Sequence, residues 1–496
     1  MRILLCLFMS IAVVTMNAQN NPPKREFRAA WIATIGNIDW PSKQGLDAET
    51  QQSEFIAILN QCKKNGLNAV IVQIRPSADA LYESPYENWS RYLSGKQGQA
   101  PTPYYDPLTF MIDAAHAQCI EFHAWFNPYR ALVDANKNSN TKDHVTWQHP
   151  EWFLNYGGKR YFDPGLPEVR DYFTNIVLDV VKRYDIDAVH FDDYFYPYRI
   201  ANVEFPDTKS YAKYRGDFTN KDDWRRHNVD ILIESLSKKI KLAKPTVKFG
   251  ISPFGVWRNY SKDVEGSHTN GGQTNYDDLY ADILLWMKKG WIDYALPQLY
   301  WEIGHKAADY TELLRWWGEH TYGRNLYIGH GLYQVGVSSK ACWRSMHEIE
   351  TQVAAARKNK NVSGSAYYSE NAFQKNLCGL NYTMQDQINT HPALLPQMPW
   401  IDHQAPDAPE LNVTNAKDGT HLLKWTVKNT SKEELQFAVY RFAANEKISI
   451  NSSANLIAIV RGTKYTDTAV GKTTYKYVVT ALDRLHNESD MSNSAE

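Results

Sequence analysis

The sequence is poor in cysteine, and its few cysteines follow no pattern typical of a metal site. It has 5 cysteines among 496 residues, and Cys6 lies in the apolar N-terminal stretch. The others are Cys62, Cys119, Cys342 and Cys378, without CxxC or histidine spacing. We therefore expect no metal site. We expect free thiols buried in the fold, with one disulfide as the alternative.

Long apolar runs, an excess of charge of one sign and a nucleotide-binding fingerprint are also missing. Beyond the N-terminus, no segment reaches the ~18 consecutive apolar residues of a membrane-spanning helix. Lys and Arg number 54 against 55 Asp and Glu, so the net charge of -1 gives no field that would attract nucleic acid. No HEXXH motif is present and no glycine fingerprint follows the first apolar segment, which disfavours a zinc hydrolase and a doubly wound open sheet. We expect no cofactor and a neutral or small ligand.

The first residues have the pattern of an export signal. Arg2 supplies the positive charge, residues 3–14 are apolar, and Ala18 offers a small residue before the expected cleavage point. The apolar run is too short to span a bilayer. We expect residues 1–18 to be a signal peptide and the mature protein to be exported to the periplasm or cell surface of a bacterium.

Short β-branched segments alternate with amphipathic segments over residues 24–395. Because this alternation is typical of βα units around a parallel sheet, it predicts a (β/α)8 TIM barrel. The eight expected strands are 27–35, 68–74, 120–126, 188–191, 248–253, 292–299, 326–331 and 363–368. The expected helices are 53–64, 108–117, 169–184, 228–242, 277–288, 310–317, 344–358 and 372–380.

The composition and the hydrophobic pattern of the sequence change after the predicted barrel. Residues 396–409 are proline-spaced, which disfavours helix and strand pairing and predicts a linker with few contacts across it. Residues 410–496 show short alternating runs at the spacing of a β-sandwich. This tail resembles a fibronectin type III domain in Trp425, in Tyr440 and in the closing run from Tyr475. A binding or spacer module is expected.

Nearly every predicted barrel strand ends in polar and aromatic residues. Active sites of TIM barrels lie at this end, where the eight βα loops converge. The candidate ligand-binding residues share this position: Arg75, His123, Trp125, Asn127, Arg130, Tyr194, Tyr196, Trp257, Arg258, Gln298, Tyr300, Trp301, His330, Tyr333 and Tyr368. Trp125, Trp257 and Trp301 are favoured as platforms for sugar rings, because aromatic faces stack on the apolar faces of pyranoses.

Six motifs in chain order resemble the bacterial glycosyl hydrolase-like 10 family. They are FRAAWIAT at 27–34, QIRPSADALY at 73–82, HAWFNPYR at 123–130, FDDYFYP at 191–197, ISPFGVWR at 251–258 and PQLYW at 297–301. The resemblance spans nearly all of residues 25–400 and implies a (β/α)8 fold with glycosidase activity. It implies a substrate such as a cell-envelope or extracellular glycan, with peptidoglycan glycan strands among the candidates.

Glycoside hydrolysis needs two carboxyl groups, one to protonate the leaving oxygen and one to act as nucleophile or base. Asp192 and Asp193 directly follow the fourth predicted strand, and if the chain stays extended, alternation of side chains would let only one of them face the sugar. The second carboxyl is then expected from Glu302 or Asp79, and aromatic neighbours are expected to raise the pKa of Glu302. Asp79, Asp193 and Glu302 should face one cleft. The alternative function is a non-catalytic carbohydrate-binding barrel.

Overall fold

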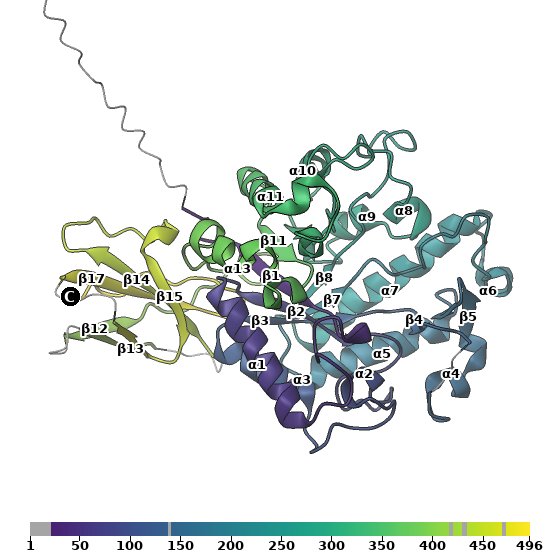
Figure 1. The fold of residues 1–496 in the computed structure, drawn as a ribbon, viewed down its shortest axis with the longest axis horizontal. Coiled ribbons are helices and arrows are strands. Elements are labelled where there is room, and N and C mark those ends of the chain that lie inside the picture. Colours follow the sequence, from purple (N-terminus) through teal and green to yellow (C-terminus); the bar gives the residue numbers. More distant parts are fainter. Residues whose placement is uncertain (1–20, 137–139, 416–419, 429–433, 469–472) are drawn as a thin grey trace, which may run out of the picture.

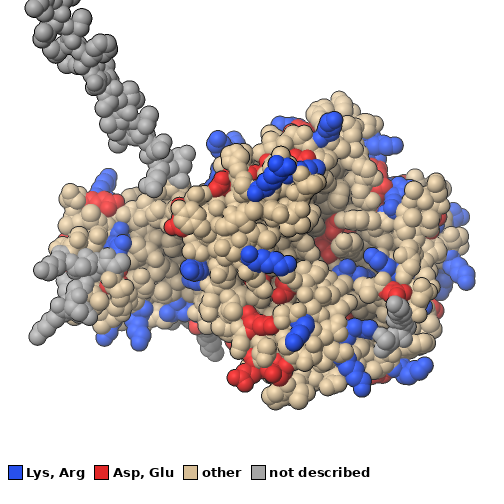
Figure 2. All heavy atoms as spheres, in the orientation of Figure 1, with Lys and Arg blue, Asp and Glu red and all other residues tan. Residues whose placement is uncertain are grey.

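The computed structural model describes residues 21–136, 140–415, 420–428, 434–468 and 473–496. The expected signal peptide, residues 1–18, lies outside these ranges. Figure 1 shows a large α/β unit that carries a smaller unit of β-sheets at one end. None of the helices in the described ranges has the length and apolar character needed to cross a bilayer. Basic and acidic side chains are interspersed over the face seen in Figure 2.

The large unit is a closed barrel of eight parallel strands, which confirms the predicted fold class. The strands follow one another around the barrel in the order β1-β11-β10-β9-β8-β7-β3-β2. All eight coincide with predicted strands: β1 Phe27–Ile32, β2 Ala69–Arg75, β3 Glu121–Phe126, β7 Ala188–Phe191, β8 Lys248–Ile251, β9 Tyr294–Ala295, β10 Asn325–His330 and β11 Gly364–Tyr367.

Helices cover the outside of the barrel because each presents an apolar stripe to the strands. The longer ones are α1 Ala48–Lys64, α3 Pro107–Ala117, α5 Pro167–Arg183, α7 Lys221–Ala243, α10 Tyr310–Glu319 and α11 His347–Lys358. The shorter ones are α2 Arg91–Ser94, α4 Val145–Gln148, α6 Thr208–Tyr214, α8 Asn275–Asp278, α9 Ile283–Lys288, α12 Asn371–Gln374 and α13 Leu380–Thr383. The helix expected over 277–288 is divided into α8 and α9, where Asp282 caps the second piece through the backbone N–H of Leu285.

Long insertions follow the carboxyl ends of β3 and β7. The first contains a small antiparallel sheet of β4 Arg130–Leu132, β6 Lys159–Phe162 and β5 Phe153–Tyr156. In Figure 1, α4, β5 and α6 lie at the end of the barrel opposite the C-terminal sheets. The loops that follow the strands therefore build up one end of the barrel, while the C-terminal unit covers the other.

Side chains that point into the barrel form successive levels along its axis. On β3, Glu121, His123 and Trp125 alternate with outward residues, because successive side chains of a strand face opposite sides. Glu121 bonds Lys248 near the start of β8, His123 bonds Tyr294 of β9, and Trp125 reaches the cleft described below. The barrel interior thus has charged side chains near the strand starts, which we call the barrel floor, and aromatic side chains near the cleft.

Two three-stranded antiparallel sheets form the C-terminal unit. One has the order β12-β13-β16, the other β15-β14-β17. Their strands are β12 Glu410–Asn415, β13 His421–Thr426, β14 Gln436–Ala443, β15 Leu456–Arg461, β16 Lys464–Asp467 and β17 Tyr475–Leu482. Trp425, Phe437 and Val479 pack in a shared core. The fibronectin type III assignment stays a prediction.

The C-terminal unit is docked on the barrel through many contacts, so the expectation of few contacts across the linker is wrong. Arg484 pairs with Asp185 and donates to the carbonyl of Ile186 at 3.1 Å. His486 lies 2.9 Å from Glu121 in the barrel floor. The linker itself contributes, because Met398 is buried in the apolar cluster of the barrel interior. Individual side chains make these contacts, and the proline-rich composition of the linker gives no sign of them.

The four cysteines in the described ranges are free. Cys62 and Cys119 are buried, as expected, whereas Cys342 is half-buried and Cys378 is exposed. The expectation that all four thiols are buried is therefore wrong for the last two, which lie in short 3-10 helices, Ala341–Arg344 and Leu377–Gly379.

Candidate active site

A cleft of about 240 Å³ opens at the carboxyl end of the barrel strands. Its walls come from residues at or just after strand ends around the barrel. The lining residues are Trp31, Trp125, Asp192, Asp193, Tyr194, Tyr198, Ser252, Gln298, Tyr300, Tyr333 and Tyr368. Two adjacent carboxylates thus lie among aromatic rings, with little other charge in the lining.

Asp192 is held from two sides. Its Oδ2 accepts a hydrogen bond from Asn127 Nδ2, and its Oδ1 accepts one from the backbone N–H of Tyr194 at 3.3 Å. Asn127 is itself fixed, because Gln73 Nε2 and Arg130 Nη2 both donate to its Oδ1. The orientation of the Asp192 carboxyl is therefore set by side chains at the ends of β2 and β3.

Asp193 has a separate set of donors. The hydroxyl of Tyr198 donates to its Oδ2, and Gln298 Nε2 lies 3.3 Å from its Oδ1. Gln298 is anchored in turn by donation to the carbonyl of Ser252 at 2.9 Å. Each acid thus has its own hydrogen-bonding framework, one on the β3 side and one on the β8 and β9 side.

Both carboxyls face the cleft, so the expectation that alternation allows only one to do so is wrong. Strand β7 ends at Phe191, and the chain turns at Asp192 and Asp193 instead of continuing as an extended strand. Burial raises the pKa of both acids. The negative charge of Asp193 raises the pKa of Asp192 further, while hydrogen bonds from Tyr198 and Gln298 partly offset the effect of burial on Asp193.

Arg130 brings a positive charge to the same end of the barrel. Its guanidinium lies over the ring of Tyr194, 5.4 Å from the ring centre, and its Nε donates to the carbonyl of Pro76. The charge of Arg130 lowers the pKa of both Asp192 and Asp193, against the larger effect of burial. This guanidinium therefore favours the ionised form of either acid.

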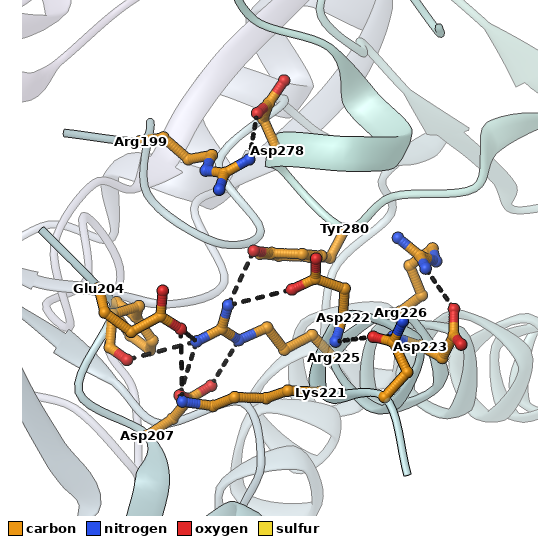
Figure 3. A network of polar contacts seen from close by, with 12 residues as sticks. Arg199, Glu204, Asp207, Lys221, Asp222, Asp223, Arg225, Arg226, Asp278 and Tyr280 are labelled. Carbon is orange, nitrogen blue, oxygen red and sulfur yellow. Dashed lines mark hydrogen bonds and ion pairs between the residues drawn. The ribbon is translucent and has the colours of Figure 1, made fainter. Parts of the chain in front are cut away.

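The loop that carries the two acids is clamped behind the cleft by the ion network in Figure 3. Arg225 of α7 binds Asp207 through Nε and Nη2 and also binds Glu204. Its Nη1 donates to the hydroxyl of Tyr280 at 2.8 Å. Buried Tyr196 packs against the ring of Tyr280 and lies under the Arg225 guanidinium. The loop is thereby tied to α7 at Tyr196, Glu204 and Asp207.

The two carboxylates proposed as partners lie elsewhere. Asp79 lines a different cavity and accepts from the backbone N–H of Ser77 at 3.0 Å, and burial raises its pKa to about 6. Glu302 is ion-paired with Lys340 at 2.7 Å. Although partial burial acts in the opposite direction, the hydrogen bond and charge of Lys340 hold the pKa of Glu302 below its usual value. The expected rise in the pKa of Glu302 is wrong, and so is the single cleft shared with Asp79 and Glu302.

The predicted binding residues fall into three groups. Those that line the cleft are Trp125, Tyr194, Gln298, Tyr300, Tyr333 and Tyr368. Asn127 and Arg130 support its acids from behind. The remainder make contacts away from the cleft lining: Arg75, His123, Tyr196, Trp257, Arg258, Trp301 and His330.

Specific partners explain why this last group is turned away. Arg75 forms a buried ion pair with Glu87, and His330 lies 3.0 Å from the hydroxyl of Ser365. Trp257 stacks on Trp316 at the outside of the barrel. These residues occupy the same motifs as cleft residues, but their partners hold them away from the cleft lining, and His123 points into the barrel one level below Trp125. Proximity in sequence does not reveal this.

Three residues of the cleft were not among the predicted binding residues. Trp31 is the last inward residue of β1, Tyr198 follows the acids, and Ser252 directly follows β8. The period-2 pattern of β1 places Phe27, Ala29 and Trp31 on one face, so this signal was present for Trp31. No group of three or more His, Cys, Asp or Glu able to hold a metal ion occurs in the described part of the chain.

Comparisons with known sequences found a matching family and similar relatives. The sequence profile of the family described as Glycosyl hydrolase-like 10 matches residues 26–345. The chain is 45% identical to "Glycosyl hydrolase YngK" of Bacillus subtilis (strain 168), over 99% of this chain and 97% of that protein. It is 37% identical to "Glycosyl hydrolase DigH" of Escherichia coli (strain K12), over 73% of this chain and 89% of that protein. A solved glycoside hydrolase domain of PgaB (BpsB) from Bordetella bronchiseptica is similar with a TM-score of 0.48 and 11% identity, covering 73% of this chain and 98% of that chain.

Proposed function

The chain belongs to the glycosyl hydrolase-like 10 family and is a glycosidase, and from this premise we propose that Asp192 and Asp193 carry out the hydrolysis. The observation that carries the proposal is the pair of adjacent carboxyls, both buried at the cleft and both with a raised pKa. Carboxyls at an aromatic cleft with raised pKa values are the groups that glycoside hydrolysis uses.

We assign the acid role to Asp192. Its pKa is raised by burial and then by the negative charge next to it, so it keeps its proton when Asp193 is ionised. Two donors from side chains, Tyr198 and Gln298, stabilise the anion of Asp193. Asp192 then protonates the glycosidic oxygen, and the carboxylate of Asp193 supplies negative charge at the anomeric carbon, as nucleophile or through a water.

The cleft lining suits a neutral sugar. Trp31, Trp125 and Tyr368 offer aromatic faces, and the indole N–H of Trp125 is buried without a hydrogen-bond partner in the described chain. A donor of this kind is costly unless a ligand satisfies it, and a sugar hydroxyl is a suitable acceptor. Tyr300 and Tyr333 pack edge-on at the same wall, with ring centres 5.9 Å apart.

We propose a cell-envelope or extracellular glycan as the substrate, with peptidoglycan glycan strands as the first to test. The support is the export pattern of residues 1–18, which would place the enzyme outside the cytoplasm. The net charge of -1 is compatible with an uncharged polysaccharide and gives no attraction to nucleic acid.

The test is the release of new reducing ends from bare peptidoglycan glycans and from a panel of other polysaccharides. Asp193→Asn keeps shape and hydrogen bonding but removes the charge, so turnover should fall roughly a thousandfold while glycan binding survives. Asp230→Asn is the matched control, because burial raises the pKa of Asp230 to about 7 at a position outside the cleft lining. Near-normal hydrolysis by Asp193→Asn would refute the assignment. Asp192→Asn should lose turnover as well, because it removes the proposed acid; near-normal hydrolysis by this variant would refute the acid role of Asp192.

A further inference from the structure

A chain of hydrogen bonds runs down the barrel axis from the cleft. Trp31 lines the cleft, and its indole Nε1 lies 3.5 Å from Nε2 of His190. Nδ1 of His190 lies 2.9 Å from the hydroxyl of Tyr294, and the same hydroxyl lies 2.9 Å from Nδ1 of His123. Nε2 of His123 lies 2.9 Å from Oε2 of Glu121. All five side chains are buried.

With both histidine rings neutral, the chemistry of the first member fixes the direction of every link. An indole N–H can only donate, so Nε2 of His190 must accept. Burial holds the pKa of His190 well below its usual value, so the ring is neutral and its one N–H is at Nδ1. Tyr294 therefore accepts from His190 and must donate its own proton to Nδ1 of His123. His123 is then left with its N–H at Nε2, which donates to Glu121.

The lower end of the chain agrees with this direction independently. An ionised carboxylate can only accept, and Glu121 is ionised. Burial alone would raise its pKa, but the charge of Lys248 and the hydrogen bonds of His123 and His486 hold it well below its usual value. His486 belongs to the C-terminal unit and lies 2.9 Å from Oε1 of Glu121. Trp31, which can only donate, thus lies at one end of the hydrogen-bond chain, and the Glu121 carboxylate, which can only accept, lies at the other.

We propose that Trp31 positions the glycan and that His190, Tyr294 and His123 are positioning residues that hold its indole through this one-way chain. The proposal rests on the proposed function only in taking the cleft as the glycan site. The chain is anchored at its far end by Glu121, where the C-terminal unit meets the barrel. One His tautomer at each position satisfies every donor and acceptor, so the orientation of Trp31 is specified from below.

The first experiment measures tautomers and needs no substrate. In full-length protein with ¹⁵N-labelled histidine, the ring signals of His190 and His123 are identified from the His190→Gln and His123→Gln variants. We expect His190 to carry its proton at Nδ1 and His123 at Nε2. The opposite tautomer at either ring, or a protonated His123 at neutral pH, would overturn the proposed direction.

The second experiment separates positioning from folding. Tyr294→Phe removes only the central hydroxyl, whereas Tyr327→Phe is the matched control in the same interior layer, with ring centres 5.1 Å apart. On a glycan that the wild type hydrolyses, Tyr294→Phe should raise KM roughly three- to tenfold, as expected for loss of one aromatic contact, with kcat within threefold. Tyr327→Phe should leave both constants unchanged. Equal effects of the two variants, or a fall in kcat alone, would contradict a positioning role.

The two experiments fail in different ways. If the wild type hydrolyses no glycan, the proposed function fails. The measured tautomers still show whether the hydrogen-bond chain has the proposed direction. If the tautomers are as expected but Tyr294→Phe binds and hydrolyses glycan normally, the chain exists and the role of Trp31 in positioning is wrong. Thermal melting of both tyrosine variants checks that each is folded at the assay temperature.

Discussion

Removal of residues 405–496 should destabilise the barrel, because the C-terminal unit forms part of its floor. The deletion removes Arg484, which pairs with Asp185 and donates to two backbone carbonyls at 3.0 and 3.1 Å. It removes His486 from Glu121, and it uncovers Leu394, which is 1% exposed and packs with residues of the C-terminal sheets. Hydrogen bonds to charged groups contribute about 1.5–3 kcal/mol each, and a buried Leu contributes a similar amount.

The combined loss is on the order of 5 kcal/mol, comparable to the total stability of many domains. With an unfolding entropy of about 2.1 cal/mol/K per residue, the ~375 residues of the barrel should melt roughly 6 °C lower. Calorimetry of the truncated and full-length proteins measures this shift. Arg484→Met should account for part of it, whereas the similarly exposed Arg441→Met, whose ion pair lies inside the C-terminal unit, serves as the control. A truncated barrel that melts within 1 °C of the full-length protein would refute the reasoning.

Three further changes test the cleft and its surroundings. Tyr198→Phe removes a donor to the Asp193 anion, which should raise the pKa of that acid and move the acidic limb of the kcat/KM profile up by roughly one pH unit; an unmoved limb would contradict the role of the hydroxyl. Glu302→Gln should keep activity within about threefold, since this side chain pairs with Lys340 outside the cleft lining, and a thousandfold loss in the reducing-end assay would make Glu302 the acid. Burial raises the pKa of Glu370 to about 8, so the folded state holds this proton more tightly than the unfolded chain; stability should fall as pH rises from about 5 to 8, and melting curves of Glu370→Gln should lack that part of the decline.

The barrel could be predicted because its signals are local. Each strand is a short, buried run between amphipathic segments, and the eight runs recur in order along the chain. Asp192 and Asp193 could be found for the same reason, since they interrupt an apolar run at its end. The error over which acid faces the cleft came from applying strand alternation to Asp192 and Asp193, which follow β7, where the backbone already turns.

The position of a residue along a strand was harder to judge than the strand itself. His123 and Trp125 lie two residues apart on the same face of β3, yet Trp125 reaches the cleft and His123 lies one level deeper. The docking of the C-terminal unit was missed because single side chains such as Arg484 and His486 meet partners about 300 to 365 residues away. No local pattern reports such pairs.

The placement of the C-terminal unit determines how the molecule can be attached to a surface. Its sheets cover the barrel end opposite the loops that build the cleft, and Lys24 and Arg25, near the start of the described chain, pair with Glu488 at that same end. A tag joined to the C-terminus, or directly before the described residues that begin at Asn21, would therefore leave from the side away from the cleft. Enzyme immobilised through such a tag should present its open face to large insoluble glycans and lose little access to them.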